Sequence, residues 1–277
     1  MKPELAIHAR VVSVNLDGKT AIYIHGGGSG GNHTMLLRPA KWMIEKGMFS
    51  KVILPDRRGE GLSTPLTKKQ TIKGHALDMK HLLDVLGIQE KVTVLGLSYG
   101  GPIALTLAHL DHRIDEVILM ASSPSLEEAK GLSGFLYKHN LLDPIIKVFY
   151  KLNLGKEKQK YPDFEAVYDL KSEKEIMKLF VKAMKSTDKK MYESLMFQNA
   201  STLDKENSSI SQNITLSIPI YQVIGDQDEI WETDLFPYKE RFPNMTSAKI
   251  VGANHKGSLL RASEFYEALL NIYRKTE

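Results

Sequence analysis

The sequence predicts an α/β fold built on a doubly wound, mostly parallel sheet into which a helical segment is inserted. Six short apolar runs are spread along the 277 residues, and each is continuous rather than alternating, as in parallel strands covered by helices on both faces. Helical patterns separate most of the runs, and such alternation is typical of a doubly wound sheet. One long interval, between the fourth and fifth runs, contains no strand-like segment.

The expected strands are AIYI, KVILP, KVTVLGL, DEVILMA, IPIYQVIG and SAKIVG, at residues 21–24, 51–55, 91–97, 115–121, 218–225 and 247–252. The chain before Ala21 has space for only one strand, and whether the usual first strand is present is left open. After the first of these runs, a glycine-rich loop leads to a plausible helix start near Thr34.

Two helices are predicted from apolar residues that recur three and four positions apart. In the segment 71–87 these residues are Ile72, Ala76, Met79, Leu83 and Leu86. Gly87 is placed to cap the carboxyl end of that helix. In the segment 258–275 they are Leu259, Ala262, Tyr266, Leu269 and Tyr273. The chain should therefore end on a helix packed against the sheet.

Residues 124–212 form the interval without strands, which is too long for a simple crossover between neighbouring strands. We expect a helical cap at 124–212 inserted into a core made of residues 1–123 and 213–277. The interval is rich in Leu, Met, Tyr and Phe and holds 15 lysines but no arginine. The interval therefore lacks the planar guanidinium group that best binds a carboxylate or phosphate through two hydrogen bonds. An alternative is that the interval only covers an edge of the sheet.

Composition excludes several classes of function. Lys and Arg exceed Asp and Glu by only 37 to 33, so we expect neither nucleic acid nor a membrane surface as a partner. The absence of cysteine excludes disulfides, thiolate nucleophiles and cysteine-ligated zinc. The beginning of the chain has no secretory signal pattern, and no stretch approaches the roughly 20 apolar residues of a membrane helix. We expect a cytoplasmic protein that acts on a small molecule; oligomeric state is left open.

The loop HGGGSGG after the first apolar run has two interpretations. Gly26, Gly28 and Gly31 satisfy G-x-G-x-x-G, the dinucleotide fingerprint, and Asp56 resembles the acid that binds the ribose. Glycines at this place can instead present backbone N–H groups to an oxyanion. The oxyanion interpretation is favoured, because a nucleotide-binding loop would leave the motifs described in the following paragraphs as coincidences.

The segment VTVLGLSYGGPIALTLA places G-x-S-x-G at a turn between a buried strand and a helix. Its glycines allow the tight turn, and Ser98 is expected to stand exposed at the carboxyl end of the sheet, near the positive end of a helix dipole. A serine hydroxyl needs a neighbouring base, and that base usually needs a carboxylate. Ser98 is therefore the predicted nucleophile.

The base and the acid should follow the serine in the chain, acid first. The later histidines are His109, His112, His139 and His255. Only His255, in VGANHKG after the last strand, is placed to reach Ser98. The strand IPIYQVIG is followed by Asp226, Asp228 and Glu229, any one of which could orient His255, while the others would serve as turn-forming or solvated groups.

These motifs together resemble the α/β-hydrolase fold superfamily, in its serine-hydrolase form with a helical cap. The resemblance includes HGGGSGG, LPDRRGEGLS, which is similar to D-x-R-G-x-G-x-S, the turn GLSYGG, the G-x-x-D of GDQD and the NH of GANH. It implies Ser98 as nucleophile, Asp228 rather than Asp226 as acid and His255 as base. The implied oxyanion donors are the backbone N–H groups of Gly27 and Tyr99, with Gly28 as a near alternative to Gly27.

The expected activity is hydrolysis of a small, largely apolar carboxylic ester or related acyl compound through an acyl-enzyme, with no cofactor and no metal ion. Aminopeptidase and carbon–carbon bond hydrolase activities use the same triad and stay open. Gly28 and Tyr99 stand where proline iminopeptidases have proline and usually tryptophan, so a peptidase is not favoured. A non-catalytic protein that holds a small ligand in the same pocket is the alternative from another class.

Overall fold

The computed structural model describes most of the expected core and little of the expected cap. The described residues are 6–14, 17–27, 31–124, 213–231, 233–234 and 236–275, together with 148, 172–176, 178–179, 194, 197 and 210. The predicted cap at 124–212 therefore lies almost wholly outside the described residues. The division of the chain into core and cap stays a prediction.

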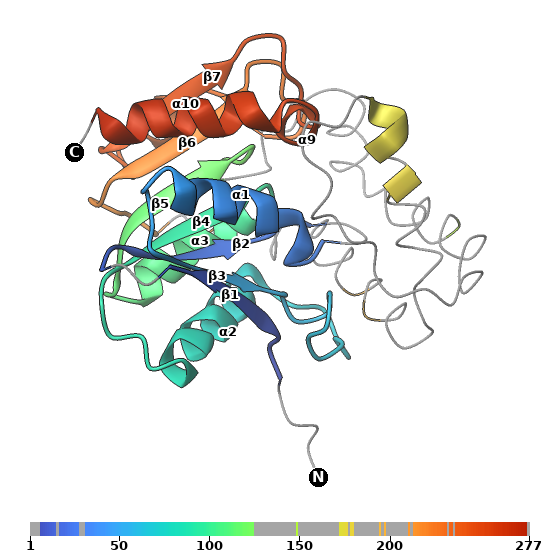
Figure 1. The fold of residues 1–277 in the computed structure, drawn as a ribbon, viewed down its shortest axis with the longest axis vertical. Helices are drawn as coiled ribbons and strands as arrows, with labels where there is room; N and C mark the ends of the chain where they lie inside the picture. The colour runs from blue at the N-terminus through green and yellow to red at the C-terminus, as the bar shows by residue number, and fades with distance from the viewer. Residues whose placement is uncertain are drawn as a thin grey trace.

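A seven-stranded sheet forms the centre of the described chain (Figure 1). In chain order its strands are β1 (Ala9–Ser13), β2 (Thr20–Ile24), β3 (Lys51–Pro55), β4 (Val92–Leu97), β5 (Ile114–Met120), β6 (Ile220–Gly225) and β7 (Met245–Ile250). The spatial order is β1-β3-β2-β4-β5-β6-β7. All neighbours are parallel except β1 and β3, which pair antiparallel. The doubly wound, mostly parallel sheet predicted from the sequence is confirmed, and one described strand precedes Ala21.

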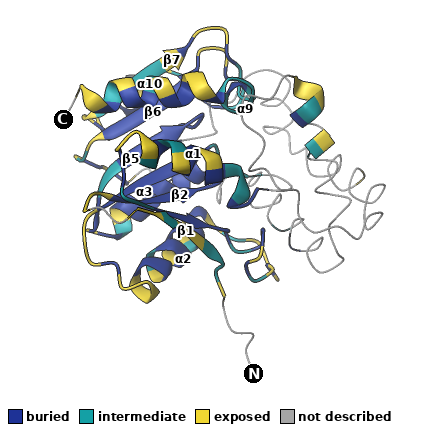
Figure 2. Cartoon of the chain, viewed as in Figure 1, coloured by how far each residue is buried: buried dark blue, intermediate teal, exposed yellow. Residues whose placement is uncertain are grey.

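Helices cover both faces of this sheet. They are α1 (Thr34–Glu45), α2 (Ile72–Val85), α3 (Gly100–Leu110), α9 (Gly257–Leu260) and α10 (Ala262–Arg274), with a short 3₁₀ helix at Phe236–Tyr238. Apolar residues of α2 and α3 pack in one core cluster, while those of α1 and α10 pack in a second one. Figure 2 shows the central strands, such as β2 and β6, buried between these two layers, whereas the edge strands β1 and β7 are partly exposed.

The two layers explain why the apolar runs are continuous. Along β2, Ile22 and Ile24 belong to the cluster on the α2 and α3 side, whereas Ala21 and Tyr23 belong to the cluster on the α1 and α10 side. Successive side chains of a strand point to opposite faces, so both faces of a central strand need apolar residues. None of these four residues is exposed.

Two details differ from the helix patterns. Leu86 is 41% exposed, because α2 ends at Val85 and the chain then turns through Gly87, whose φ is +67°. The terminal helix is broken at Arg261, with φ −132° and ψ 39°, which separates α9 from α10. Leu259 therefore lies on the short first piece and is only half-buried.

None of the helices in the described part of the chain has the length and the apolar character that crossing a membrane requires.

Candidate active site

Ser98 sits on a strained turn at the carboxyl end of β4. Its φ is +49°, a left-handed conformation that costs a residue with a side chain roughly 1–2 kcal/mol. Two glycines make the turn possible. A Cβ atom on Gly96 would lie 2.3 Å from the Gly100 carbonyl oxygen, and one on Gly100 would lie 2.3 Å from the Ile24 oxygen. The close packing of strand and helix therefore holds the serine side chain out at the end of the sheet.

The structure brings Ser98, His255 and Asp228 into one chain of hydrogen bonds. His255 Nε2 lies 3.1 Å from Ser98 Oγ, and His255 Nδ1 lies 3.0 Å from Asp228 Oδ2. A carboxylate can only accept a hydrogen bond, so the imidazole proton is on Nδ1 and Nε2 is left to accept from the serine hydroxyl. These three residues follow β4, β7 and β6, whose carboxyl ends meet at one edge of the sheet.

The three acids after β6 have separate contacts. Asp228 is 4% exposed, and its Oδ1 accepts the backbone N–H groups of Ile230 and Trp231 at 2.9 and 3.0 Å. Asp226 is exposed and accepts the N–H of Gly252 at 2.7 Å. Glu229 accepts the backbone N–H of His255 at 3.1 Å. Of the three, Asp228 is the one whose carboxylate meets the imidazole ring.

The other histidines that follow Ser98 lie at the far end of α3 or outside the described residues. His109 and His112 are exposed near the carboxyl end of α3, whereas Ser98 lies two residues before the amino end of that helix. His139 is outside the described residues.

The two expected oxyanion donors come from segments that flank Ser98. Tyr99 follows the serine directly and precedes α3. Gly27 follows Gly26, and a Cβ atom on Gly26 would lie 3.3 Å from Ser98 Cβ. The loop after β2 therefore passes close beside Ser98, while Gly28 lies outside the described residues.

Trp231 is a neighbour of Ser98 that sequence reasoning missed. Its side chain is buried, and its indole Nε1–H donates to Ser98 Oγ at 3.4 Å. Its own backbone N–H donates to Asp228. A tryptophan three residues after a candidate acid is a weak sequence signal, because tryptophan is more often simply part of a core.

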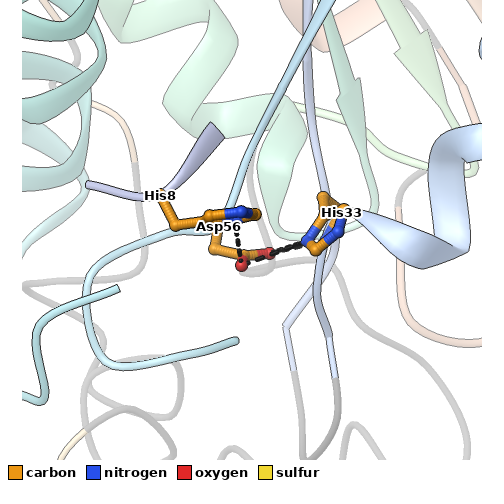
Figure 3. A group of neighbouring side chains, drawn as sticks. All are labelled: His8, His33 and Asp56. Carbon is orange, nitrogen blue, oxygen red and sulfur yellow. Dashed lines mark hydrogen bonds and ion pairs between the residues drawn. The ribbon is translucent and has the colours of Figure 1, made fainter. Parts of the chain in front are cut away.

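A cluster of His8, His33 and Asp56 is the group in the described part of the chain whose atoms could hold a metal ion (Figure 3). Both ring Nδ1 atoms donate to the carboxylate of Asp56, at 2.9 Å from His8 and 3.0 and 3.1 Å from His33. The same carboxylate accepts the backbone N–H groups of His33 and Leu62 at 2.7 and 2.9 Å. These four donors fill the acceptor positions of the Asp56 carboxylate. The cluster therefore joins the end of β3 to the start of α1 by hydrogen bonds.

Charges are also buried beneath the glycine loop. Burial, reinforced by Arg57, lowers the pKa of His25 to about 3, so its ring is neutral. Burial raises the pKa of Glu60 to about 8 against the attraction of Arg57. For Asp56, hydrogen bonds from His33 and Leu62 outweigh the opposing effect of burial and lower the pKa to about 2. Asp56 is therefore ionised at neutral pH, while His25 carries no charge.

Comparisons with known proteins agree with this architecture. A family model described as the alpha/beta hydrolase fold matches residues 22–262. A bromoperoxidase from Bacillus anthracis is 19% identical, with a TM-score of 0.72 and coverage of 99% of this chain and 97% of that one. A thermophilic esterase from Thermogutta terrifontis is 18% identical, with a TM-score of 0.69 and coverage of 99% and 96%.

A meta-cleavage product hydrolase from Pseudomonas fluorescens IP01 is 17% identical, with a TM-score of 0.68 and coverage of 99% of this chain and 96% of that one. At such identities the similarity concerns the fold, and a fold hosts many activities. The family model spans most of the sequence, from β2 to the start of α10. The chain belongs to the α/β-hydrolase fold family.

Proposed function

We propose that this protein is a serine hydrolase that cleaves a small, largely apolar carboxylic ester or related acyl compound. The observation that carries the proposal is the hydrogen-bonded chain from Ser98 Oγ through the His255 ring to Asp228. A nucleophile, a base within hydrogen-bond reach and a carboxylate that orients the base are the parts that acyl transfer needs.

In the proposed reaction His255 Nε2 takes the proton of Ser98 as Oγ attacks the substrate carbonyl carbon. The carbonyl oxygen gains negative charge, and the N–H groups of Gly27 and Tyr99 donate to it. His255 then gives the proton to the leaving alcohol as the bond between carbon and alcohol oxygen breaks. A water molecule, deprotonated by the same ring, attacks the acyl-enzyme, and release of the acid restores the serine.

The proposed acyl preference rests on the segment 124–212, which leaves the core at the carboxyl end of β5. This segment is rich in apolar residues and has no arginine. A buried carboxylate on the acyl group would lack a fork-shaped partner and would be costly to desolvate. Neutral acyl groups are therefore favoured over charged ones.

The test is a substrate panel measured with the parent enzyme, Ser98→Ala and the control Ser13→Ala. Ser13 is exposed on β1, far along the chain from the triad. The panel contains chromogenic acyl esters, aminoacyl amides and vinylogous diketones. The proposal requires ester turnover that Ser98→Ala abolishes and Ser13→Ala retains.

Other outcomes decide against it in different ways. Turnover of the amides or the diketones alone would replace ester hydrolysis by a peptidase or a carbon–carbon hydrolase activity with the same triad. Saturable binding of a panel compound without any turnover would identify a ligand-binding protein. Ester turnover that is unchanged in Ser98→Ala would remove Ser98 as nucleophile.

A further inference from the structure

Arg57 is a buried arginine that the proposed mechanism does not yet use. It occupies the unspecified second position of the D-x-R-G-x-G-x-S stretch, whereas Arg58 matches the arginine of that motif. Arg57 is fully buried, and its Nη2 donates to the Gly26 carbonyl oxygen at 2.7 Å and to Glu60 Oε1 at 3.1 Å. Among the described residues, its Nε and Nη1 have no hydrogen-bond partner.

The Gly26 carbonyl belongs to the peptide unit that carries the Gly27 N–H. No peptide bond in the described chain is cis, and in a planar trans peptide the carbonyl and the N–H point in opposite directions. Whatever fixes the carbonyl of Gly26 therefore fixes the direction of the Gly27 N–H. Gly26 lies next to Ser98, so that direction decides whether the N–H can meet a substrate oxygen there.

A second donor to the same carbonyl also depends on Arg57. The backbone N–H of Arg57 donates to His25 Nε2 at 3.0 Å, so Nε2 is an acceptor and the ring proton is on Nδ1. His25 Nδ1 lies 2.9 Å from the Gly26 oxygen and donates to it. Because the buried ring is neutral, this tautomer is the one that satisfies both contacts. The carbonyl is thus held by two donors.

Arg57 also contacts the other expected donor residue. Its guanidinium carbon lies 5.2 Å from the centre of the Tyr99 ring, within the range of a cation–π interaction. Tyr99 is 1% exposed, so this contact lies in the interior. One side chain thus touches both the loop that contains Gly27 and the residue that follows Ser98.

We propose that Arg57 is a positioning residue for the oxyanion hole, which it builds by holding the Gly26 carbonyl so that the Gly27 N–H is directed at the substrate oxygen. This inference rests on the proposed function, since an oxyanion hole has a role only if Ser98 attacks a carbonyl. Arg57 acts through the peptide unit and does not touch the substrate. Preorganised donors of this kind matter more in the transition state than in the bound substrate.

The test compares Arg57→Met with the matched variant Arg58→Met on an ester and on its thionoester, which has sulfur in place of the carbonyl oxygen. Arg58 is bound to Asp78 at 3.0 and 2.7 Å through two guanidinium nitrogens. Sulfur accepts hydrogen bonds weakly, so the thionoester depends little on the oxyanion hole. Ester kcat should fall about 100-fold in Arg57→Met, with KM nearly unchanged, whereas thionoester kcat falls much less.

The ratio of ester to thionoester rates separates positioning from general damage to the fold. In Arg57→Met the ratio should drop, and in Arg58→Met it should stay at the parent value. Equal losses on both substrates, or no loss on either, would overturn the inference. The variant His25→Asn, which removes the second donor to the Gly26 carbonyl, should lower the same ratio to a smaller extent. If Arg57→Met does not fold, an unchanged ratio in His25→Asn is the result that would refute the inference.

Failure of this inference differs from failure of the proposed function. If the parent protein hydrolyses the ester through Ser98 and the ratio does not respond to Arg57→Met or His25→Asn, only the role of Arg57 is wrong. If the parent protein hydrolyses neither substrate, the proposed function fails and the inference fails with it.

Discussion

The substitution Asp228→Asn should reverse the direction of the hydrogen bond between Asp228 and His255 while keeping the shape of the side chain. The two oxygens of Asp228 have different partners. Oδ1 accepts the N–H groups of Ile230 and Trp231, and Oδ2 accepts from His255 Nδ1. An asparagine has only one oxygen, and its NH₂ group can only donate.

The backbone contacts decide which way the asparagine turns. Its oxygen keeps the N–H groups of Ile230 and Trp231, because leaving the buried N–H of Trp231 without an acceptor costs about 1–3 kcal/mol. Its NH₂ group then faces Nδ1 of His255, which must accept rather than donate. The ring proton moves to Nε2, and His255 can no longer take the proton of Ser98.

We expect kcat to fall about 10⁴-fold, the loss that this change of tautomer causes in a known Ser-His-Asp protease. That loss is about 5 kcal/mol of barrier. KM should change little, because Asp228 is buried behind His255. The matched variant is Asp226→Asn, two positions away, whose carboxylate is exposed and binds only the N–H of Gly252 in the described chain. It should retain kcat within a few-fold.

The assay is steady-state hydrolysis of the best ester from the panel, with thermal unfolding to show that both variants are folded. If Asp228→Asn retained a tenth or more of the parent kcat, its assignment as the orienting acid would be refuted. If Asp226→Asn were the more damaging change, the acid would lie two positions earlier than the geometry indicates.

Three further predictions concern single side chains. Trp231→Phe keeps the buried ring but removes the donor to Ser98 Oγ, so kcat should fall about 3- to 10-fold, as expected for one hydrogen bond; an unchanged kcat would show that the indole N–H is idle. Gly61→Ala should lower the free energy of unfolding in urea by about 2 kcal/mol or more, because φ is +56° and the new Cβ would lie 2.2 Å from Asp56 Cγ. Gly87→Ala should lower the free energy of unfolding by only about 1 kcal/mol, because φ is +67° but no atom lies within 4 Å of the new Cβ. Equal losses in the two variants would contradict the predicted clash at Gly61. In the folded protein His25 stays neutral down to about pH 3. The stability of the parent relative to His25→Asn should therefore be full above pH 6.5 and fall by up to about 1.4 kcal/mol per pH unit as the pH drops from there toward 3. A constant difference would mean that the folded state protonates His25 as readily as the unfolded chain does.

The sequence predicted the sheet well because each central strand is covered on both faces. Val94 and Leu95 of β4 are both unexposed and belong to opposite core clusters, which makes the apolar run continuous and easy to recognise. Strand β1 carries no such signal. It lies at the edge of the sheet, and Val11 is 45% exposed, so the sequence indicated only that a strand had space there.

Ser98 could be singled out as the candidate nucleophile from the sequence because the strained turn needs glycines at fixed positions around it. The candidate acid could not be chosen from the residues alone, since Asp226 and Asp228 both follow β6. The two carboxylates point in different directions: that of Asp228 turns inward to His255, and that of Asp226 turns outward to Gly252.

The buried network under the glycine loop left no pattern in the sequence. Arg57 reads as an ordinary charged loop residue next to Arg58, and charged residues are seldom fully buried. Glu60 lies only three positions after Arg57, whereas His25 comes from a segment 32 positions earlier and is brought to Arg57 by the fold. The contacts of His8 and His33 with Asp56 join segments that are 48 and 23 positions apart.

The most direct test of the proposed function is detection of the acyl-enzyme. The protein is mixed with an activated ester, quenched with acid during the first turnovers and analysed by intact mass and peptide mapping. A covalent acyl group should appear on the peptide that contains Ser98, and it should be absent when Ser98→Ala is treated in the same way. Ester turnover with the acyl group on another residue, or an acyl group that Ser98→Ala acquires equally, would contradict the proposed mechanism.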